Sequence, residues 1–240
     1  MSTGFDLSLL QAISDWQRGS TPKRAQALKV ASATLPEKYR AYGISCFRQI
    51  ALPKGGVWDL IGEDNLPEKI SSWTTSLEVA EAFKSGVPPE GQGYQGVILC
   101  VFPHPENVII NLSKLFQEPG FTNALDQNKA SITGYQDGAG RFANSQSEVV
   151  LEIATVTQQD IYSMGGHSSP FEQLIDEAAK QIYGPDATAR QRKELLLKSS
   201  RVRSQAGPCW LSAEATQRVL DRMKPEAERL REIKRRQDSG

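Results

Sequence analysis

Residues 96–102, GVILCVF, form a run in which every side chain after the first glycine is apolar. The run is far shorter than the about 20 apolar residues that a helix needs to cross a membrane. A short and continuously apolar run is typical of a central strand that is covered on both faces. We therefore expect this segment to lie inside a β-sheet.

Other segments follow the two-residue period of strands or the longer period of helices. The predicted further strands are ISCFRQIAL (44–52), ISSWTT (70–75), NVIINL (107–112) and EVVLEIATV (148–156). The predicted helices are residues 5–18, residues 22–33, FEQLIDEAAKQIY (171–183), ARQRKELLLKSSRVR (189–203) and SAEATQRVLDRMKPEAERLREIKRR (212–236). This order predicts the α+β fold class, with helices at both ends of the chain.

Two segments have few apolar residues and are predicted as loops. Residues 84–96 contain four glycines and two prolines, which favour turns. Residues 117–147 are rich in Gly, Asn, Gln, Asp and Ser. A polar stretch of this length between strands is usually functional or disordered. Because it ends next to residues with a possible chemical role, we favour a functional loop.

The composition limits the class of protein. A chain of 240 residues with 39% apolar content suits one large domain, or one domain with an appendage. Its three cysteines lie far apart and it has two histidines, which argues against a disulfide framework or a zinc site. It has no long apolar run, and its N-terminal segment lacks the features of a signal peptide. We expect a metal-free protein of the cytoplasm that does not bind a membrane.

The net charge is zero, but the charges are unevenly distributed along the chain. Residues 186–240 carry 14 Lys and Arg against 8 Asp and Glu, a net charge of +6, and the remainder carries −6. A basic segment of this kind is compatible with a phosphate-bearing partner, although the pattern also suits a solvated helix face.

A glutamine and a glutamate, Gln146 and Glu148, stand two residues apart at the start of the predicted strand 148–156. In an extended chain, residues two apart point to the same side. We therefore expect the amide and the carboxyl to share one face. Taken alone, the pair favours a solvated strand end, and the other motifs of the chain shift the interpretation towards a reactive site.

Three hydroxyl residues, Thr74, Thr75 and Ser76, follow the predicted strand 70–75 and precede a short helical pattern. Thr75 and Glu78 have the spacing of a capping box, in which each side chain bonds to the other's backbone. This interpretation explains Thr75 and leaves the hydroxyl of Thr74 free at the end of the strand.

Arg48 lies inside the apolar strand 44–52. Either it is an edge residue that points to water, or its planar guanidinium binds an anion through two bonds. Arg40, which precedes the strand, is a competing candidate for the second role.

In order along the chain, an aromatic–Arg pair, hydroxyl residues before a short helix, and Gln-x-Glu on a late strand resemble the Arg–Ser–Glu class of mono-ADP-ribosyltransferases. This is the family of the clostridial toxins that modify Rho proteins and actin. The match is carried by CFRQI (46–50), SWTTSLEVAEAF (72–83) and SQSEVVLEI (145–153), and it covers about residues 40–165. The family's Ser-Thr-Ser is here Thr74-Thr75-Ser76, which keeps a hydroxyl at each position.

The resemblance implies a split mixed β-sheet core in a catalytic domain of residues 1–165, followed by a helical C-terminal extension of residues 166–240. It implies NAD⁺ as co-substrate, with the pyrophosphate on Arg48 and further contacts from residues 74–76. Thr74 would help to position Glu148. Glu148 would accept a hydrogen bond from the 2′-hydroxyl of the nicotinamide ribose and stabilise the oxocarbenium-like transition state.

Gln146 would orient the acceptor in this scheme. Relatives that modify arginine carry Glu at this position, whereas a neutral amide exchanges hydrogen bonds with another amide or with a base edge. We therefore favour a nucleobase of RNA as acceptor, with an asparagine-like protein side chain as the alternative. Tyr135 and Phe142 are candidates for stacking on a base, and equally for anchoring the loop.

The resemblance further predicts an intracellular toxin that is restrained by an antitoxin, or a phage-defence toxin that modifies RNA. Two other functions remain open. The chain is a catalytically silent binding module if Thr74 cannot perform the function of the family's serine. It is an NAD⁺ glycohydrolase if water serves as acceptor.

Overall fold

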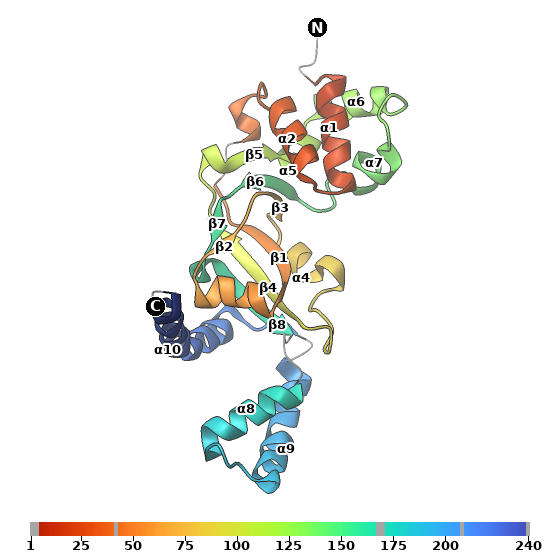
Figure 1. Cartoon of the computed structure of the whole chain (residues 1–240). Helices are drawn as coiled ribbons and strands as arrows, with labels where there is room; N and C mark the ends of the chain where they lie inside the picture. The colour runs from red at the N-terminus through yellow and green to blue at the C-terminus, as the bar shows by residue number, and fades with distance from the viewer. Residues whose placement is uncertain (1–4, 41–42, 167–170, 207–208, 239–240) are drawn as a thin grey trace. The chain divides into compact units, whose positions relative to one another are not determined.

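The computed structural model of the chain describes residues 5–40, 43–166, 171–206 and 209–238 (Figure 1). The fold is mixed α+β, as predicted. A six-stranded sheet has the order β5-β6-β3-β1-β4-β8, and its pairs β1–β3, β3–β6, β4–β8 and β5–β6 are antiparallel. Its strands are β1 Cys46–Pro53, β3 Ile70–Thr74, β4 Tyr94–Val101, β5 Val108–Asn111, β6 Glu148–Glu152 and β8 Ile161–Gly166. Two short strands, β2 Leu66–Pro67 and β7 Thr155–Val156, pair separately.

The chain forms two compact units, each built from alternating segments. The first comprises Met1–Arg48, Pro67–Ala80 and Cys100–Thr155, and the second comprises Gln49–Leu66, Glu81–Leu99 and Val156–Gly240. The segment 166–240 lies in the second unit together with two earlier segments. The division into domains at residues 165 and 166 stays a prediction.

The first unit begins with the two predicted helices, α1 Leu7–Arg18 and α2 Pro22–Ala31. Asp6 caps α1 by accepting from the Leu9 backbone N–H at 2.9 Å, and Thr21 caps α2 ahead of Pro22. The spacing of Leu10, Ile13 and Trp16 places one stripe of α1 in the core, as the sequence predicts. This core also contains residues of β5 and β6 and of the helices α5 Leu112–Phe116 and α6 Pro119–Asn128.

The prediction of a loop at residues 117–147 is wrong. This segment forms α6, the short helix η5 Tyr135–Asp137 and α7 Ala139–Phe142, and it buries Phe121 and Ile132 in the core of the first unit. Its few apolar residues are spaced at helical intervals. A count of polar residues does not reveal that spacing.

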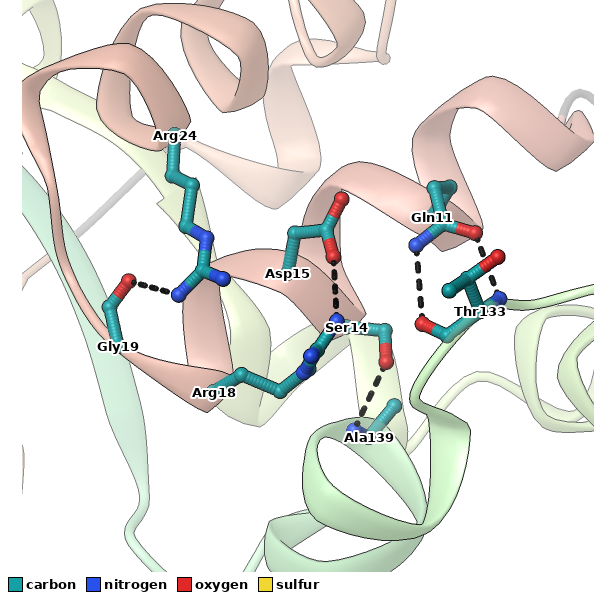
Figure 2. A network of polar contacts seen from close by, with 8 residues as sticks. All are labelled: Gln11, Ser14, Asp15, Arg18, Gly19, Arg24, Thr133 and Ala139. Carbon is teal, nitrogen blue, oxygen red and sulfur yellow. Dashed lines mark hydrogen bonds and ion pairs between the residues drawn. The ribbon is translucent and has the colours of Figure 1, made fainter.

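Helix α1 is bonded directly to this segment (Figure 2). The side-chain amide of Gln11 donates to the Thr133 carbonyl at 3.1 Å and accepts from the Thr133 N–H at 2.9 Å. Ser14 Oγ accepts from the Ala139 N–H at 3.4 Å. A Cβ on Gly138 would lie 2.3 Å from the Ser14 carbonyl oxygen, so this close approach requires glycine.

The predicted strands appear with two changes. EVVLEIATV is interrupted after Glu152, so it forms β6 and the short β7 instead of one strand. Strand β8 has no counterpart in the prediction, because its sequence, IYSMGG, ends in Met and two glycines. Its partners come from distant residues: Met164 donates to Thr216 Oγ1 at 3.2 Å and accepts from the Leu211 N–H at 2.9 Å. The predicted loop 84–96 is largely confirmed, although β4 starts at Tyr94.

The second unit holds the three predicted C-terminal helices, α8 Phe171–Tyr183, α9 Ala189–Ala206 and α10 Ala213–Asp238. Helix α10 packs against β8 and against the helical segment η2 Trp58–Gly62, and Lys234 of α10 pairs with Glu63 at 2.6 Å. The remaining short helices of the chain are η1 Glu37–Tyr39, α3 Lys54–Val57, α4 Leu77–Ala82, η3 Phe83–Ser85, η4 Pro105–Asn107 and η6 Gln158–Asp160. None of the helices within the described residues is both long enough and apolar enough to cross a membrane.

Candidate functional site

Glu148, the first residue of β6, has a buried carboxylate that is bonded by three side chains of the first unit. Glu148 as a whole is 4% exposed. Oε1 accepts from Trp16 Nε1 at 2.8 Å and from the Ser72 hydroxyl, and Oε2 accepts from Gln17 Nε2 at 3.4 Å. All three donors are neutral groups, so none of these bonds supplies a compensating positive charge.

The register of the sheet explains why Ser72 reaches this carboxylate. In the antiparallel pair β3–β6, Thr74 lies opposite Glu148, and Ser72 lies opposite Val150. Because side chains alternate along a strand, Ser72 and Thr74 project from the same face as Glu148. Trp16 and Gln17 come from the C-terminal half of α1, which packs over this end of the first unit.

Burial raises the pKa of the Glu148 carboxyl above its ordinary value, and the hydrogen bonds from Ser72, Trp16 and Gln17 oppose part of that rise. Removing a carboxylate from water without a cationic partner is unfavourable for its ionised form. Such perturbed carboxyl groups concentrate at functional sites, although structural networks also produce them.

The hydroxyl residues 74–76 are all engaged with backbone around the site. Thr74 Oγ1 donates to the Gln146 carbonyl at 2.7 Å and accepts from the Ser76 N–H at 3.1 Å, so the prediction of a free hydroxyl is wrong. The predicted capping box of Thr75 and Glu78 is not seen within the described residues: Ser76 Oγ, and not Thr75, caps α4 by accepting from the Val79 N–H at 3.3 Å, and valine cannot return the bond. The Thr75 N–H donates to the Ser147 carbonyl at 3.1 Å.

The geometry expected for Gln146 is also wrong. Ser147 has a φ of 45°, in the left-handed region, so the chain is not extended between Gln146 and Glu148. Strand β6 starts only at Glu148. The rule that residues two apart share a face therefore does not apply across this pair.

Arg48 is not an edge residue, because β1 lies between β3 and β4 in the sheet. One terminal nitrogen of its guanidinium donates to the Ser72 carbonyl at 2.9 Å, and its Nε lies 3.5 Å from Glu68 Oε2. This buried Nε has no hydrogen-bond partner within the described residues. Burial lowers the pKa of the Arg48 guanidinium, and the Glu68 carboxylate opposes part of this effect. The competing candidate, Arg40, donates to the Ser32 and Ala33 carbonyls after α2.

Arg48 lines a cavity of about 770 Å³ in the first unit. Its lining includes polar side chains from the residues just before α2 and from β1, β3 and β6, and neither Thr74 nor Glu148 belongs to it. The lining residues are Ser20, Thr21, Pro22, Ala25, Arg48, Glu68, Lys69, Ile70, Ser71, Asn107, Glu152, Ile153 and Ala154. The structure thus brings Thr74 next to Glu148 and joins Arg48 to Glu148 through Ser72. The cavity lined by Arg48 does not include Thr74 or Glu148 in its lining.

The two candidate acceptor residues lie in the helical segment before β6. Tyr135 is partly buried against the core of the first unit, which suits the anchoring alternative. Phe142 is partly exposed, with the Arg141 guanidinium 5.2 Å from its ring centre. A role of either ring in acceptor binding stays a prediction. Within the described residues, no group of three or more His, Cys, Asp and Glu side chains is arranged to hold a metal ion.

Sequence reasoning missed four residues around the site: Trp16, Gln17, Glu68 and Ser72. Ser72 carries a usable signal, since it alternates with Thr74 along the same strand. Trp16 carries none, because its helical spacing predicts only that it is buried. Glu148 is its hydrogen-bond partner from 132 residues further along the chain. No family model, no curated protein and no solved structure matches this chain.

Proposed function

We propose that the chain is an NAD⁺-dependent mono-ADP-ribosyltransferase and that Glu148 is its catalytic carboxylate. The observation that carries the proposal is the environment of Glu148, a buried carboxylate held by neutral donors beside Thr74 at the start of a strand. A carboxylate without a cationic partner keeps its charge available for a positive charge that develops in a transition state.

The proposed fold is the split sheet of this enzyme class. Supporting it, β1 and β3 are neighbours at the centre of the six-stranded sheet, and these two strands carry residues of the first two motifs.

In the proposed reaction, the bond between the nicotinamide nitrogen and C1′ of the ribose breaks, and its electron pair leaves with neutral nicotinamide. Glu148 accepts a hydrogen bond from the ribose and stabilises the oxocarbenium-like sugar. A nucleophile on the acceptor then bonds to C1′ and loses its proton to solvent. Arg48 binds the pyrophosphate, and a cavity of about 770 Å³ beside it is within the ordinary range for small-molecule sites.

The proposed acceptor is a nucleobase of RNA, recognised by the amide of Gln146. Helix α9 supports a phosphate-bearing partner, since it carries six basic residues and one acidic residue. Of the basic residues, Arg190, Arg192, Lys193 and Lys198 are exposed. An acceptor of this kind fits the proposed role of an intracellular toxin that is held in check by an antitoxin.

The test is to incubate the purified chain with NAD⁺ labelled in its adenylate phosphate and with separate pools of RNA, DNA and cell protein. We expect label in the RNA pool, and its loss in Glu148→Gln. Labelled protein with unlabelled RNA would replace the nucleobase with an asparagine-like acceptor. The absence of label in every pool, together with the absence of nicotinamide release, would refute the proposal.

A second candidate function is a binding module without catalysis. It is favoured by one observation: both oxygens of Glu148 are already occupied by donors of the chain itself. This alternative predicts heat of NAD⁺ binding in calorimetry without any release of nicotinamide. An NAD⁺ glycohydrolase predicts release at full rate with no macromolecular acceptor present.

A further inference from the structure

The two oxygens of the Glu148 carboxylate are held very differently. Oε1 receives two hydrogen bonds, from Trp16 Nε1 at 2.8 Å and from the Ser72 hydroxyl. Among the residues that the structure describes, Oε2 receives only the 3.4 Å bond from Gln17, whose amide nitrogen also donates to the Ala143 carbonyl at 3.2 Å. Gln17 Oε1 is buried and has no hydrogen-bond partner within the described residues. One oxygen is therefore fixed, and the other is covered by a weakly bonded side chain.

We propose that Trp16 is a positioning residue, whose indole N–H fixes Oε1 of Glu148 so that Oε2 is presented to the ribose of NAD⁺. The inference rests on the proposed function for its second half, the presentation of Oε2 to a substrate. Its first half, that Trp16 fixes the position of Glu148, stands on the hydrogen bond from Trp16 Nε1 to Oε1 and on the burial of both residues.

Trp16 is suited to this role because its own position is strongly fixed. The residue is 2% exposed and lies in the core of the first unit. Its helix is bonded to the segment 133–139 by Gln11 and Ser14 (Figure 2). An aromatic ring has few rotatable bonds, so a buried indole is a stiff donor. A longer amide or ammonium side chain would lose more conformational freedom.

The charged side chains around Glu148 do not replace Trp16 as partners. On α1, Asp15 and Arg18 pair with each other at 3.2 Å (Figure 2). On β1, Arg48 contacts Glu68 and the Ser72 carbonyl. On α7, Arg141 lies over the ring of Phe142. The ionisation of Glu148 therefore depends on its burial and on its three neutral donors.

The chain provides a matched control in Trp73. It is also 2% exposed, and its Nε1 donates to Ser71 Oγ at 2.9 Å instead of to Glu148. Trp16→Phe and Trp73→Phe therefore remove the same atoms from equally buried sites. Only the first removes a donor from the carboxylate.

The first measurement is the pH dependence of nicotinamide release by both variants. We expect Trp16→Phe to lower kcat about tenfold or more with little change in the KM for NAD⁺, because a hydrogen bond to a charged group is lost. Loss of this bond further disfavours the ionised carboxyl, so the acid limb of the rate profile moves to higher pH. Trp73→Phe keeps the wild-type limb. A Trp16→Phe profile like that of the wild type, or an equal shift in Trp73→Phe, would overturn the proposal.

The second measurement does not require a Trp16 variant that folds, and it does not depend on enzymatic activity. The wild-type chain has four tryptophans, and the indole N–H of Trp58 also donates to a carboxylate, that of Glu63, at 2.8 Å. In the ¹H–¹⁵N spectrum, the Trp58 indole should therefore titrate in both proteins, and one further indole N–H should follow a titration that is absent in Glu148→Gln. If no indole besides that of Trp58 titrates, or if both titrations persist in Glu148→Gln, the link between Trp16 and Glu148 is refuted. A Glu148-dependent indole titration in a chain that releases no nicotinamide would instead refute the proposed function and leave the link intact.

Discussion

Strand β6 begins and ends with a glutamate, and the two glutamates differ in their exposure and in the groups that compensate their charge. Glu152 pairs with Lys29 at 2.6 Å, and its side chain is 45% exposed, so a cation and water both compensate its charge. Glu148 is 4% exposed and is bonded by an indole, a hydroxyl and an amide. The first arrangement is typical of a protein surface. The second keeps a carboxylate without a counter-ion, which supports a catalytic role for Glu148 and not for Glu152.

The largest expected effect separates the two glutamates by activity. Glu148→Gln keeps the shape of the side chain and removes its charge, so we expect nicotinamide release to fall by roughly a hundred- to a thousandfold. NAD⁺ affinity, measured by calorimetry, should change little, since the proposed role of the charge is in the transition state. Glu152→Gln is the matched control and should retain its kcat, with any change confined to the KM for NAD⁺, because Glu152 lines the cavity beside Arg48. Comparable losses in the two variants would remove the distinction between the ends of β6.

The next effect tests how firmly α1, which carries Trp16 and Gln17, is packed against α7. Gly138→Ala places a Cβ 2.3 Å from the Ser14 carbonyl oxygen, which forces α1 away from α7. We expect a loss of about 1–3 kcal/mol in the free energy of unfolding, measured with urea. Gly55→Ala, where a Cβ meets no atom within 4 Å, is the control and should change stability by less than about 0.5 kcal/mol. If Gly138→Ala cost no more unfolding free energy than Gly55→Ala, the close packing of α1 against α7 would not be required for stability.

The third prediction concerns the pH dependence of stability. Because the folded-state pKa of Glu148 is raised by burial, the native chain holds this proton to a higher pH than the unfolded chain does. The stabilisation of the folded chain by protonated Glu148 is therefore fully present below the ordinary glutamate pKa. It is lost as pH rises through the raised pKa of the folded chain. Urea titrations across this interval should show the wild type losing stability relative to Glu148→Gln. A constant difference between the two would contradict the raised pKa.

The smallest effect belongs to the exposed end of the strand. Removing the Lys29–Glu152 pair by Glu152→Gln should cost less than about 1 kcal/mol in unfolding free energy, because solvent screens both charges. The loss should shrink as salt is added. A larger and salt-independent loss would show that Glu152 is held as tightly as Glu148.

The fold was largely predictable where residue spacing is local. Helices α1 and α2 follow from a stripe of apolar residues and from Asp6, Thr21 and Pro22 at their starts. The strands of the sheet follow from alternation or from continuous apolar runs. Helices α6 and α7 were missed because their sparse apolar residues are diluted by polar ones. Strand β8 was missed because it is held by distant residues, through its pairing with β4 and its bonds to Leu211 and Thr216.

The candidate site was predictable only in part. Thr74 and Glu148 were singled out from short motifs, and the sheet places them opposite each other. The roles of individual atoms were not predictable, because a left-handed residue such as Ser147 breaks the period of two without any mark in the sequence. Long-range bonds such as Trp16–Glu148 leave no local pattern either.

The most direct test of the account is the release of nicotinamide from NAD⁺ by the purified wild-type chain, followed by chromatography with and without RNA. The account predicts release that increases when RNA is added, that rises with pH as Glu148 ionises, and that disappears in Glu148→Gln. A wild-type chain that binds NAD⁺ and leaves it intact under all these conditions would contradict it.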